Sequence, residues 1–146
     1  MMRIKVMKFG GTSVSDQESR LLAARKVADA VEAGFSPVVV VSAIGRAGMP
    51  YATDTLLNLL AEVDPLVAPE PREVDLMLCC GEIMSTCVFA QTLKSLGYPA
   101  SAMTGGQAGI ITDDTHGNAR IVEIQPADVI RALERGRIPV VCGFQG

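Results

Sequence analysis

The chain has 146 residues, of which 49% are hydrophobic and 20% charged, which excludes a disordered or collagen-like protein and allows one modest domain with a hydrophobic core. Its formal net charge of -3 at pH 7 argues against electrostatic binding to nucleic acid. No uninterrupted apolar run reaches the ~18 residues that span a bilayer, and the N-terminus lacks the features of a signal peptide, so we expect no membrane partner and a cytoplasmic location.

The beginning of the chain predicts two strands joined by a helix. Residues 3–9, "RIKVMKF", are nearly continuous in apolar character and predict the first strand. The capping-box pattern "SDQE" predicts that Ser15 is the N-cap of a helix that ends near Gly34. Four consecutive valines at residues 38–41 then predict a central parallel strand that is covered on both faces.

The rest of the chain continues this alternation of helices and strands. The expected elements are, in order, a short helix capped by Thr53 or Asp54, a long helix over 72–96, a short strand over 98–103, an irregular or hairpin segment over 104–122, a helix opened by Pro126 and a strand over 138–144. The pattern predicts an α/β fold, an αβα sandwich with a mainly parallel sheet.

The cysteines do not predict a metal or redox site. Cys79, Cys80, Cys87 and Cys142 contain no C-x-x-C spacing, so neither a zinc site nor a thioredoxin-like motif is indicated. We expect them to be small buried hydrophobic residues in a reducing compartment. No metal ligands are predicted anywhere in the chain.

The loops that follow the predicted strands carry the first candidate site. Ligands of open α/β sheets bind beyond the carboxyl ends of the strands. Lys8, Gly10 and Gly11 follow or end the first strand, Ser42 follows the second, and the glycine-flanked loop 143–146 follows the last, so small residues recur at one predicted edge. The glycines can let backbone N–H groups approach an anion, and the lysine can supply a positive charge. Neither known phosphate-loop signature is present, however, and the pattern by itself favours an ordinary tight turn with an exposed lysine.

Glu82 is the second candidate. The predicted buried face of the long helix includes Gly81, with Glu82 at its border, and is marked by Val74, Met77, Leu78, Met84 and Val88. A carboxylate there must be paired, hydrated or functional, and the pattern alone favours an ordinary boundary glutamate. His116 has no evident partner and is predicted to be a plain loop residue, and Asp113 and Asp114 indicate a turn without the spacing of a calcium loop.

Several segments together resemble the aspartate kinases of the amino-acid-kinase family. They are "KFGGTSV" at 8–14, "VVVVSA" at 38–43, Gly81-Glu82, "HGNARIV" at 116–122 and "GFQG" at 143–146. The resemblance covers essentially the whole chain in order. It implies the amino-acid-kinase fold and transfer of the γ-phosphoryl group of ATP, with Mg²⁺, to the side-chain carboxylate of L-aspartate. That reaction opens the pathway to lysine, threonine, methionine and diaminopimelate.

The resemblance also implies roles for individual residues. Lys8, Phe9, Gly10 and Gly11 would contact the ATP phosphates, with Lys8 catalytic and Ser42 nearby. Thr53, Glu82 and Phe144 would line the aspartate pocket, with Glu82 binding the amino group of the substrate. The family's kinase domain is longer, so residues 1–146 would be its N-terminal portion, without the regulatory domains, and would have little activity alone. We also expect a homo-oligomer.

Two other functions remain as alternatives. One is a related kinase that acts on glutamate, carbamate, acetylglutamate or a nucleotide, with a different acceptor pocket around Thr53 and Glu82. The other is a non-catalytic fragment that acts through oligomerisation. A dinucleotide-binding Rossmann domain is disfavoured because the glycine fingerprint is missing.

Overall fold

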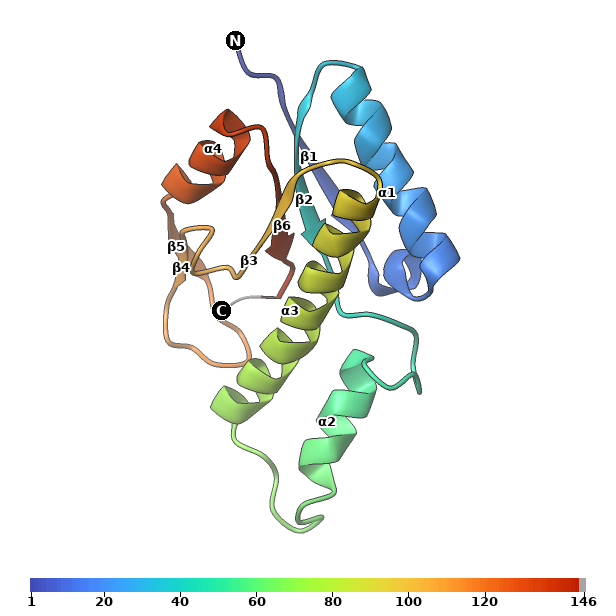
Figure 1. Cartoon of the computed structure of the whole chain (residues 1–146). Coiled ribbons are helices and arrows are strands. Elements are labelled where there is room, and N and C mark those ends of the chain that lie inside the picture. The colour runs from blue at the N-terminus through green and yellow to red at the C-terminus, as the bar shows by residue number, and fades with distance from the viewer. Residues whose placement is uncertain (145–146) are drawn as a thin grey trace.

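The computed structural model describes residues 1–144 and contains a four-stranded sheet in which all neighbouring strands are parallel (Figure 1). In spatial order the strands are β1 (Ile4–Phe9), β2 (Ser36–Val41), β6 (Ile138–Cys142) and β3 (Ala100–Met103). The predicted α/β fold with a mainly parallel sheet is therefore confirmed. The valine-rich β2 and the apolar β6 are the two central strands, as expected for strands that are buried on both faces.

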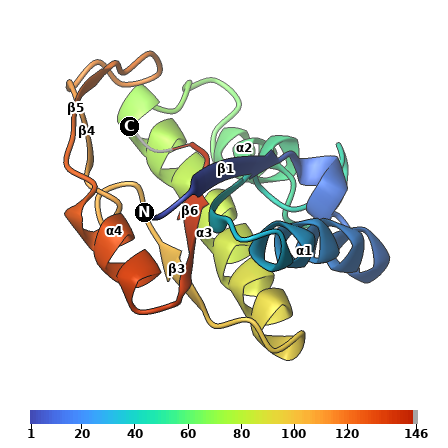
Figure 2. The same ribbon diagram turned by 90° about the horizontal axis from the view of Figure 1, so that it is seen from above.

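Helices cover both faces of the sheet, because alternate valines of the central strands point to opposite sides. On one face Val39 and Val140 pack with α1 (Gln17–Glu32) and α3 (Pro71–Ser95). On the other face Val38 and Val141 pack with α4 (Ala127–Glu134). Figure 2 shows α1 and α4 on opposite sides of the strands.

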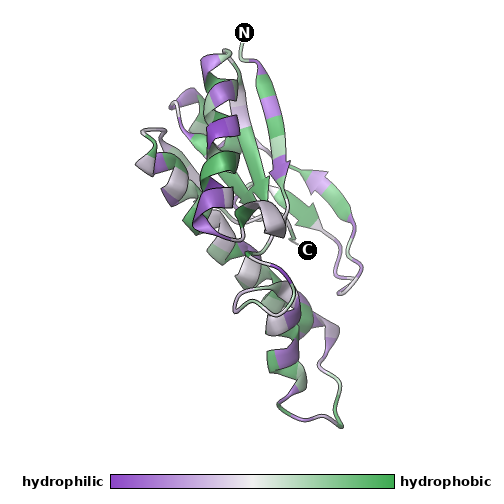
Figure 3. Cartoon of the chain, turned by 90° about the vertical axis from the view of Figure 1, so that its right-hand side faces the viewer, coloured by the Kyte–Doolittle hydropathy of each residue, from purple (hydrophilic) through white to green (hydrophobic). Residues whose placement is uncertain are grey.

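Two segments extend from this sandwich. Strands β4 (Ile110–Thr112) and β5 (Ile121–Ile124) form a separate antiparallel pair, which confirms the predicted hairpin. Helix α2 (Thr53–Ala61) and the loop after it project beyond the sheet (Figure 3). Their exposed apolar side chains include Leu59, Val63, Leu66 and Val67, and Tyr51, just before the helix, is also exposed.

Among the described residues, α3 is the one helix that is long and apolar enough to cross a membrane by length and composition alone. A core helix of a soluble protein passes the same test. In this fold α3 packs against α1, α2 and strands β2, β3 and β6, so it serves as the central helix of the sandwich.

The helix N-termini differ from their predictions. The N-cap of α1 is Asp16, whose Oδ1 accepts a hydrogen bond of 2.8 Å from Ser19 N, and not Ser15. Ser15 is displaced because a short 3₁₀ helix over Gly11–Val14 precedes α1, and its hydroxyl donates to Thr12 O. Helix α2 begins without a side-chain cap, because its N-cap residue is Ala52 and Asp54 instead accepts from Gly48 N.

The predicted buried face of α3 was only partly right. Gly81 is buried as expected, but Met84 and Val88 are 36% and 37% exposed, and Glu82 is only 7% exposed and lies on the buried face. Apolar periodicity could not place this face, because the buried side of α3 carries polar residues and its outer side carries apolar ones.

The prediction for the cysteines was right for one of four. Cys142 is buried, Cys79 is intermediate, and Cys80 and Cys87 are exposed on α3. In the part of the chain that the structure describes, none of the four forms a disulfide. The two exposed cysteines share the outer side of α3 with Met84 and Val88, so the same error of face explains them.

Candidate active site at the carboxyl edge of the sheet

Three strands end at the same level, so the loops that follow them leave the sheet together. Phe9 is paired with Val41, and Val41 with Cys142. The next residues continue the contact, since Ser42 N donates to Phe9 O at 3.1 Å and Gly143 N donates to Val41 O at 2.9 Å. Lys8, Gly10, Ser42 and Gly143 are therefore brought to one edge, as the sequence predicted. Gln145 and Gly146, the end of the predicted glycine-flanked loop, lie outside the described residues.

The two glycines after β1 meet different surroundings. A Cβ on Gly10 would have no heavy atom within 4 Å, so its backbone is open to a ligand. A Cβ on Gly11 would lie 2.6 Å from Ala43 O and 2.9 Å from Gly45 O. Gly11 is therefore required for close packing of the β1 loop against the β2 loop, and neither residue has positive φ. Gly11 therefore has a packing requirement that Gly10 lacks.

Glu82 is the central charged group of this edge. Its Oε2 accepts a hydrogen bond of 3.1 Å from Gly143 N. Burial raises the pKa of Glu82 above its usual 4.5, while the backbone N–H groups of Ala43, Gly143 and Phe144 and the charge of Lys8 act to lower it. The Glu82 carboxylate thus accepts hydrogen bonds from the loops after β2 and β6 and interacts electrostatically with Lys8 of β1. Glu82 is not an ordinary boundary glutamate.

Helix α2 lies against α3 next to this carboxylate. A Cβ on Gly81 would come within 2.7 Å of Leu56 Cδ1, so the glycine allows the two helices to approach closely. Thr53, the first residue of α2, is exposed. The same Cβ on Gly81 would lie 3.8 Å from Tyr51 O. The residues just before Thr53 therefore pack against α3 next to Glu82.

A cavity of about 330 Å³ opens beside Glu82. Gly143 and Phe144 line one part of it, and Asp75 with residues of the β4–β5 loop, including Gly117 and Asn118, lines the rest. Gly143 belongs both to this cavity and to the hydrogen bond with Glu82. The predicted Phe144 therefore lines this cavity, whereas Glu82 does not line it and is connected to it through Gly143.

Comparisons with known proteins agree with this architecture. A model of the amino acid kinase family matches residues 3–146. The chain belongs to the amino acid kinase family. It is 48% identical over 145 residues to aspartokinase 1 of Bacillus subtilis (strain 168), which covers 99% of this chain and 35% of that protein.

Two solved structures of kinases from this family superpose on the chain. The crystal structure of aspartate kinase from Synechocystis has a TM-score of 0.77 and 38% identity, and the match covers 99% of this chain and 22% of that one. E. coli aspartokinase III, in complex with aspartate and ADP, has a TM-score of 0.73 and 21% identity over 95% of this chain and 40% of that one, which shows likeness of fold. The chain thus spans less than half of each of these relatives.

Not every polar residue of this family member was predicted. His116, expected to lack a partner, has Nδ1 3.3 Å from Asp75 Oδ2. Asp75 is 4% exposed and was missed entirely. The sequence did carry a signal for Asp75, because it lies seven positions before Glu82. That spacing places the two carboxylates two helical turns apart on the same face of the helix. The expected turn at Asp113 is confirmed, since its Oδ1 accepts from Thr115 N and Arg120 N.

Within residues 1–144, no group of three or more His, Cys, Asp or Glu side chains gathers to hold a metal ion. Glu82, the carboxylate next to the loops that follow β2 and β6, already accepts hydrogen bonds from backbone donors. The residues of the edge therefore offer hydrogen-bond donors and one lysine, a set suited to anions.

Proposed function

We propose that this chain is the N-terminal part of the catalytic domain of an aspartate kinase, which transfers the γ-phosphoryl group of ATP to the side-chain carboxylate of L-aspartate and forms 4-phospho-L-aspartate. The observation that carries this proposal is the edge at which Lys8, the open backbone of Gly10 and the buried Glu82 converge. The identity to an aspartokinase over nearly the whole chain supports it.

On the nucleotide side, we assign Lys8, Phe9, Gly10, Gly11 and Ser42 to the ATP phosphates. Phosphoryl transfer depends mainly on positioning and on neutralising charge that develops on the phosphate oxygens. Lys8 is exposed on a strand whose register is set by β2, so its charge starts from a rigid support. The backbone at Gly10 adds donors without a side chain in the way.

On the acceptor side, we assign Thr53, Glu82 and Phe144 to L-aspartate. The Glu82 carboxylate can bind the ammonium group of the substrate with the oxygen lone pairs that the backbone donors leave free. Because Lys8 acts to keep Glu82 ionised, the two proposed sites are electrostatically linked. Phe144 and the cavity beside it would enclose the rest of the amino acid.

When bound, Mg²⁺ would neutralise charge on the phosphate oxygens, and it needs only one or two carboxylates from the protein beside the substrate phosphates. Among residues 1–144 no group of three or more metal-binding side chains identifies such a site. We therefore assign no residue of 1–144 to the metal.

The test is release of ADP from MgATP in the presence of L-aspartate, with glutamate, acetylglutamate, carbamate and UMP as competing acceptors. In the complete gene product we expect aspartate to be preferred and Lys8→Ala to lower kcat/KM by about 10²–10³-fold. Lys5→Ala is the matched control, because Lys5 lies on the same strand but contacts the Phe35 ring, 5.0 Å from its Nζ. Preference for another acceptor would replace aspartate kinase by that sister activity.

The proposal also covers the activity of the 146 residues alone, the compartment of the enzyme and its oligomeric state. The 146 residues alone would transfer phosphate slowly or not at all, because a relative at 48% identity is matched over only 35% of its length. The site of action would be the cytoplasm, which is consistent with four free cysteines. The enzyme would be a homo-oligomer, which sedimentation of the complete gene product would test.

A further inference from the structure

A row of polar side chains follows one side of the N-terminal half of α3. Asp75, Cys79 and Glu82 are spaced by four and three residues, so they lie above one another on successive turns. Each one binds the backbone of a loop: Asp75 binds Gly117 N, Cys79 donates to Phe144 O, and Glu82 binds Gly143 N. This half of the helix therefore fixes loops rather than a hydrophobic core.

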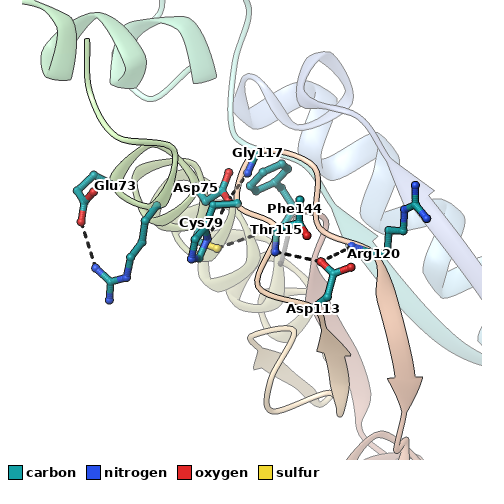
Figure 4. A network of polar contacts seen from close by, with 10 residues as sticks. Glu73, Asp75, Cys79, Asp113, Thr115, Gly117, Arg120 and Phe144 are labelled. Atoms are coloured by element: carbon teal, nitrogen blue, oxygen red, sulfur yellow. Dashed lines mark hydrogen bonds and ion pairs between the residues drawn. The ribbon is translucent and has the colours of Figure 1, made fainter. Parts of the chain in front are cut away.

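Asp75 makes the contact that the proposed function does not yet use. Its Oδ2 accepts a hydrogen bond of 2.8 Å from Gly117 N and lies 3.3 Å from His116 Nδ1 (Figure 4). The residue is 4% exposed. Burying a carboxylate to this extent costs free energy of folding unless the carboxylate is hydrogen-bonded, so these two contacts are needed to keep Asp75 buried.

Within residues 1–144, the polar contacts of this loop with α3 go to Asp75. The loop joins β4 and β5, and all four residues of β5 are exposed. A two-stranded hairpin is only marginally stable by itself. Asp113 shapes the loop internally through Thr115 N at 3.1 Å and Arg120 N at 3.2 Å, but these bonds stay within the loop. The placement of the loop against α3 therefore depends on Asp75.

This loop is one wall of the cavity beside the proposed acceptor site. Gly117, Asn118 and Ala119 line the cavity from the loop, and Gly143 and Phe144 line it from the end of β6. Glu82 and Cys79 hold the second wall through Gly143 and Phe144. Two residues of one rigid helix, Asp75 and Glu82, thus set the separation of the two walls.

We propose that Asp75 is a positioning residue that fixes the β4–β5 loop as the outer wall of the amino-acid acceptor pocket, and so sets the affinity for the acceptor but not for the nucleotide. The inference rests on the proposed function for the identity of the acceptor. The placement of the loop by Asp75 is independent of it.

The first measurement is amide hydrogen exchange in the wild type and in Asp75→Ala, Asp75→Asn, His116→Ala and Glu73→Ala. We expect Asp75→Ala to accelerate exchange in residues 113–120 at least about 10-fold and to leave β2 and β6 unchanged. Asp75→Asn keeps an oxygen for Gly117 N and should restore part of the protection. His116→Ala, which removes only the exposed partner, should show a smaller effect. Glu73→Ala is the matched control, since Glu73 is an exposed carboxylate on the same helix.

The second measurement is the KM for L-aspartate and for ATP in the complete gene product. Asp75→Ala should raise the KM for aspartate about 10-fold and leave the KM for ATP within about twofold, with partial rescue by Asp75→Asn. Unchanged exchange in 113–120, or equal increases in both KM values, would overturn the proposal. A wild type without aspartate-dependent ADP release would overturn the proposed function and the acceptor role of this wall, while faster loop exchange in Asp75→Ala would still establish that Asp75 places the loop.

Discussion

The two halves of α3 perform different tasks on the same sheet. In the C-terminal half, Phe89, Ala90 and Leu93 are almost fully buried and pack on the strands, and Phe89 stacks on Phe9 with ring centroids 5.5 Å apart. In the N-terminal half, the buried side carries Asp75, Gly81 and Glu82. One half stabilises the domain, and the other arranges the loops beyond the strand ends.

This difference shows how a single helix can combine a core with a site. Apolar burial is non-directional and tolerates imprecise partners. A buried carboxylate is tolerated only with donors in defined places, so it specifies loop positions at some expense of stability. Anchoring both functions in one rigid helix ties the geometry of the site to the packing of the sheet.

The largest expected effect is in the apolar half. Phe89→Ala should lower the free energy of unfolding by about 3–5 kcal/mol, because a side chain with 0% exposure leaves a cavity in the core. Urea denaturation measures the change. A loss below about 1 kcal/mol would mean that the C-terminal half of α3 is not the stabilising half.

The polar half can be tested with two buried residues three positions apart. Glu82→Ala should lower the free energy of unfolding by about 1–3 kcal/mol, because the hydrogen bonds from the backbone N–H groups of Ala43, Gly143 and Phe144 to its carboxylate are lost, although Gly143 N keeps its bond to Val41 O. Ser85→Ala is the matched control: within the described residues its buried Oγ has no hydrogen-bond partner. Removing that hydroxyl should change stability by less than about 0.5 kcal/mol or increase it. Equal losses in both variants would contradict the specific role of Glu82.

Gly11 and Gly10 form a second matched pair at the same edge. Gly11→Ala should destabilise the chain by about 1–3 kcal/mol, because its Cβ would lie 2.6 Å from Ala43 O. Gly10→Ala, with φ of -75° and open space, should leave stability within about 0.5 kcal/mol and weaken ATP binding instead. Thermal melts and nucleotide titrations separate the two outcomes, and similar melting temperatures would refute the close packing of Gly11.

A pH series sharpens the account of Glu82. Because burial raises its pKa above 4.5, the folded state binds this proton more tightly than the unfolded state. The contribution of Glu82 to stability is then fully present below pH 4.5 and declines as pH rises through the raised pKa, by at most about 1.4 kcal/mol per unit. Denaturation of the wild type and Glu82→Gln from below pH 4.5 to neutrality measures it. A stability difference that grows with pH would show that the backbone donors outweigh burial.

The smallest effect is expected on the solvent side of α3. Glu73→Ala removes an ion pair with Arg72 in which the two side chains are 48% and 66% exposed. Exposed pairs contribute about 0–1 kcal/mol, so stability should change little. A loss as large as that of Glu82→Ala would mean that surface charge, rather than buried polarity, organises this half of the helix.

Much of this protein follows from the amino-acid sequence by itself. The valine-rich strands, the alternation of strands with helices and the glycine-bearing loops are local patterns, and they sufficed for the parallel sheet and for the meeting of Lys8, Gly10, Ser42 and Gly143 at one edge. Chain order decides this outcome, because parallel strands with helical crossovers bring all their carboxyl ends to the same side.

Only the tertiary structure decided which side of α3 is buried and what its carboxylates bind. Apolar periodicity selected Met84 and Val88 for the interior, but the helix turns Glu82 and Asp75 inward instead. The partner of Asp75 lies 42 residues away in a hairpin loop, and the partner of Glu82 lies 61 residues away. The free energy of a buried charge depends on hydrogen-bond donors from segments far away in the sequence, so no local sequence pattern can predict it.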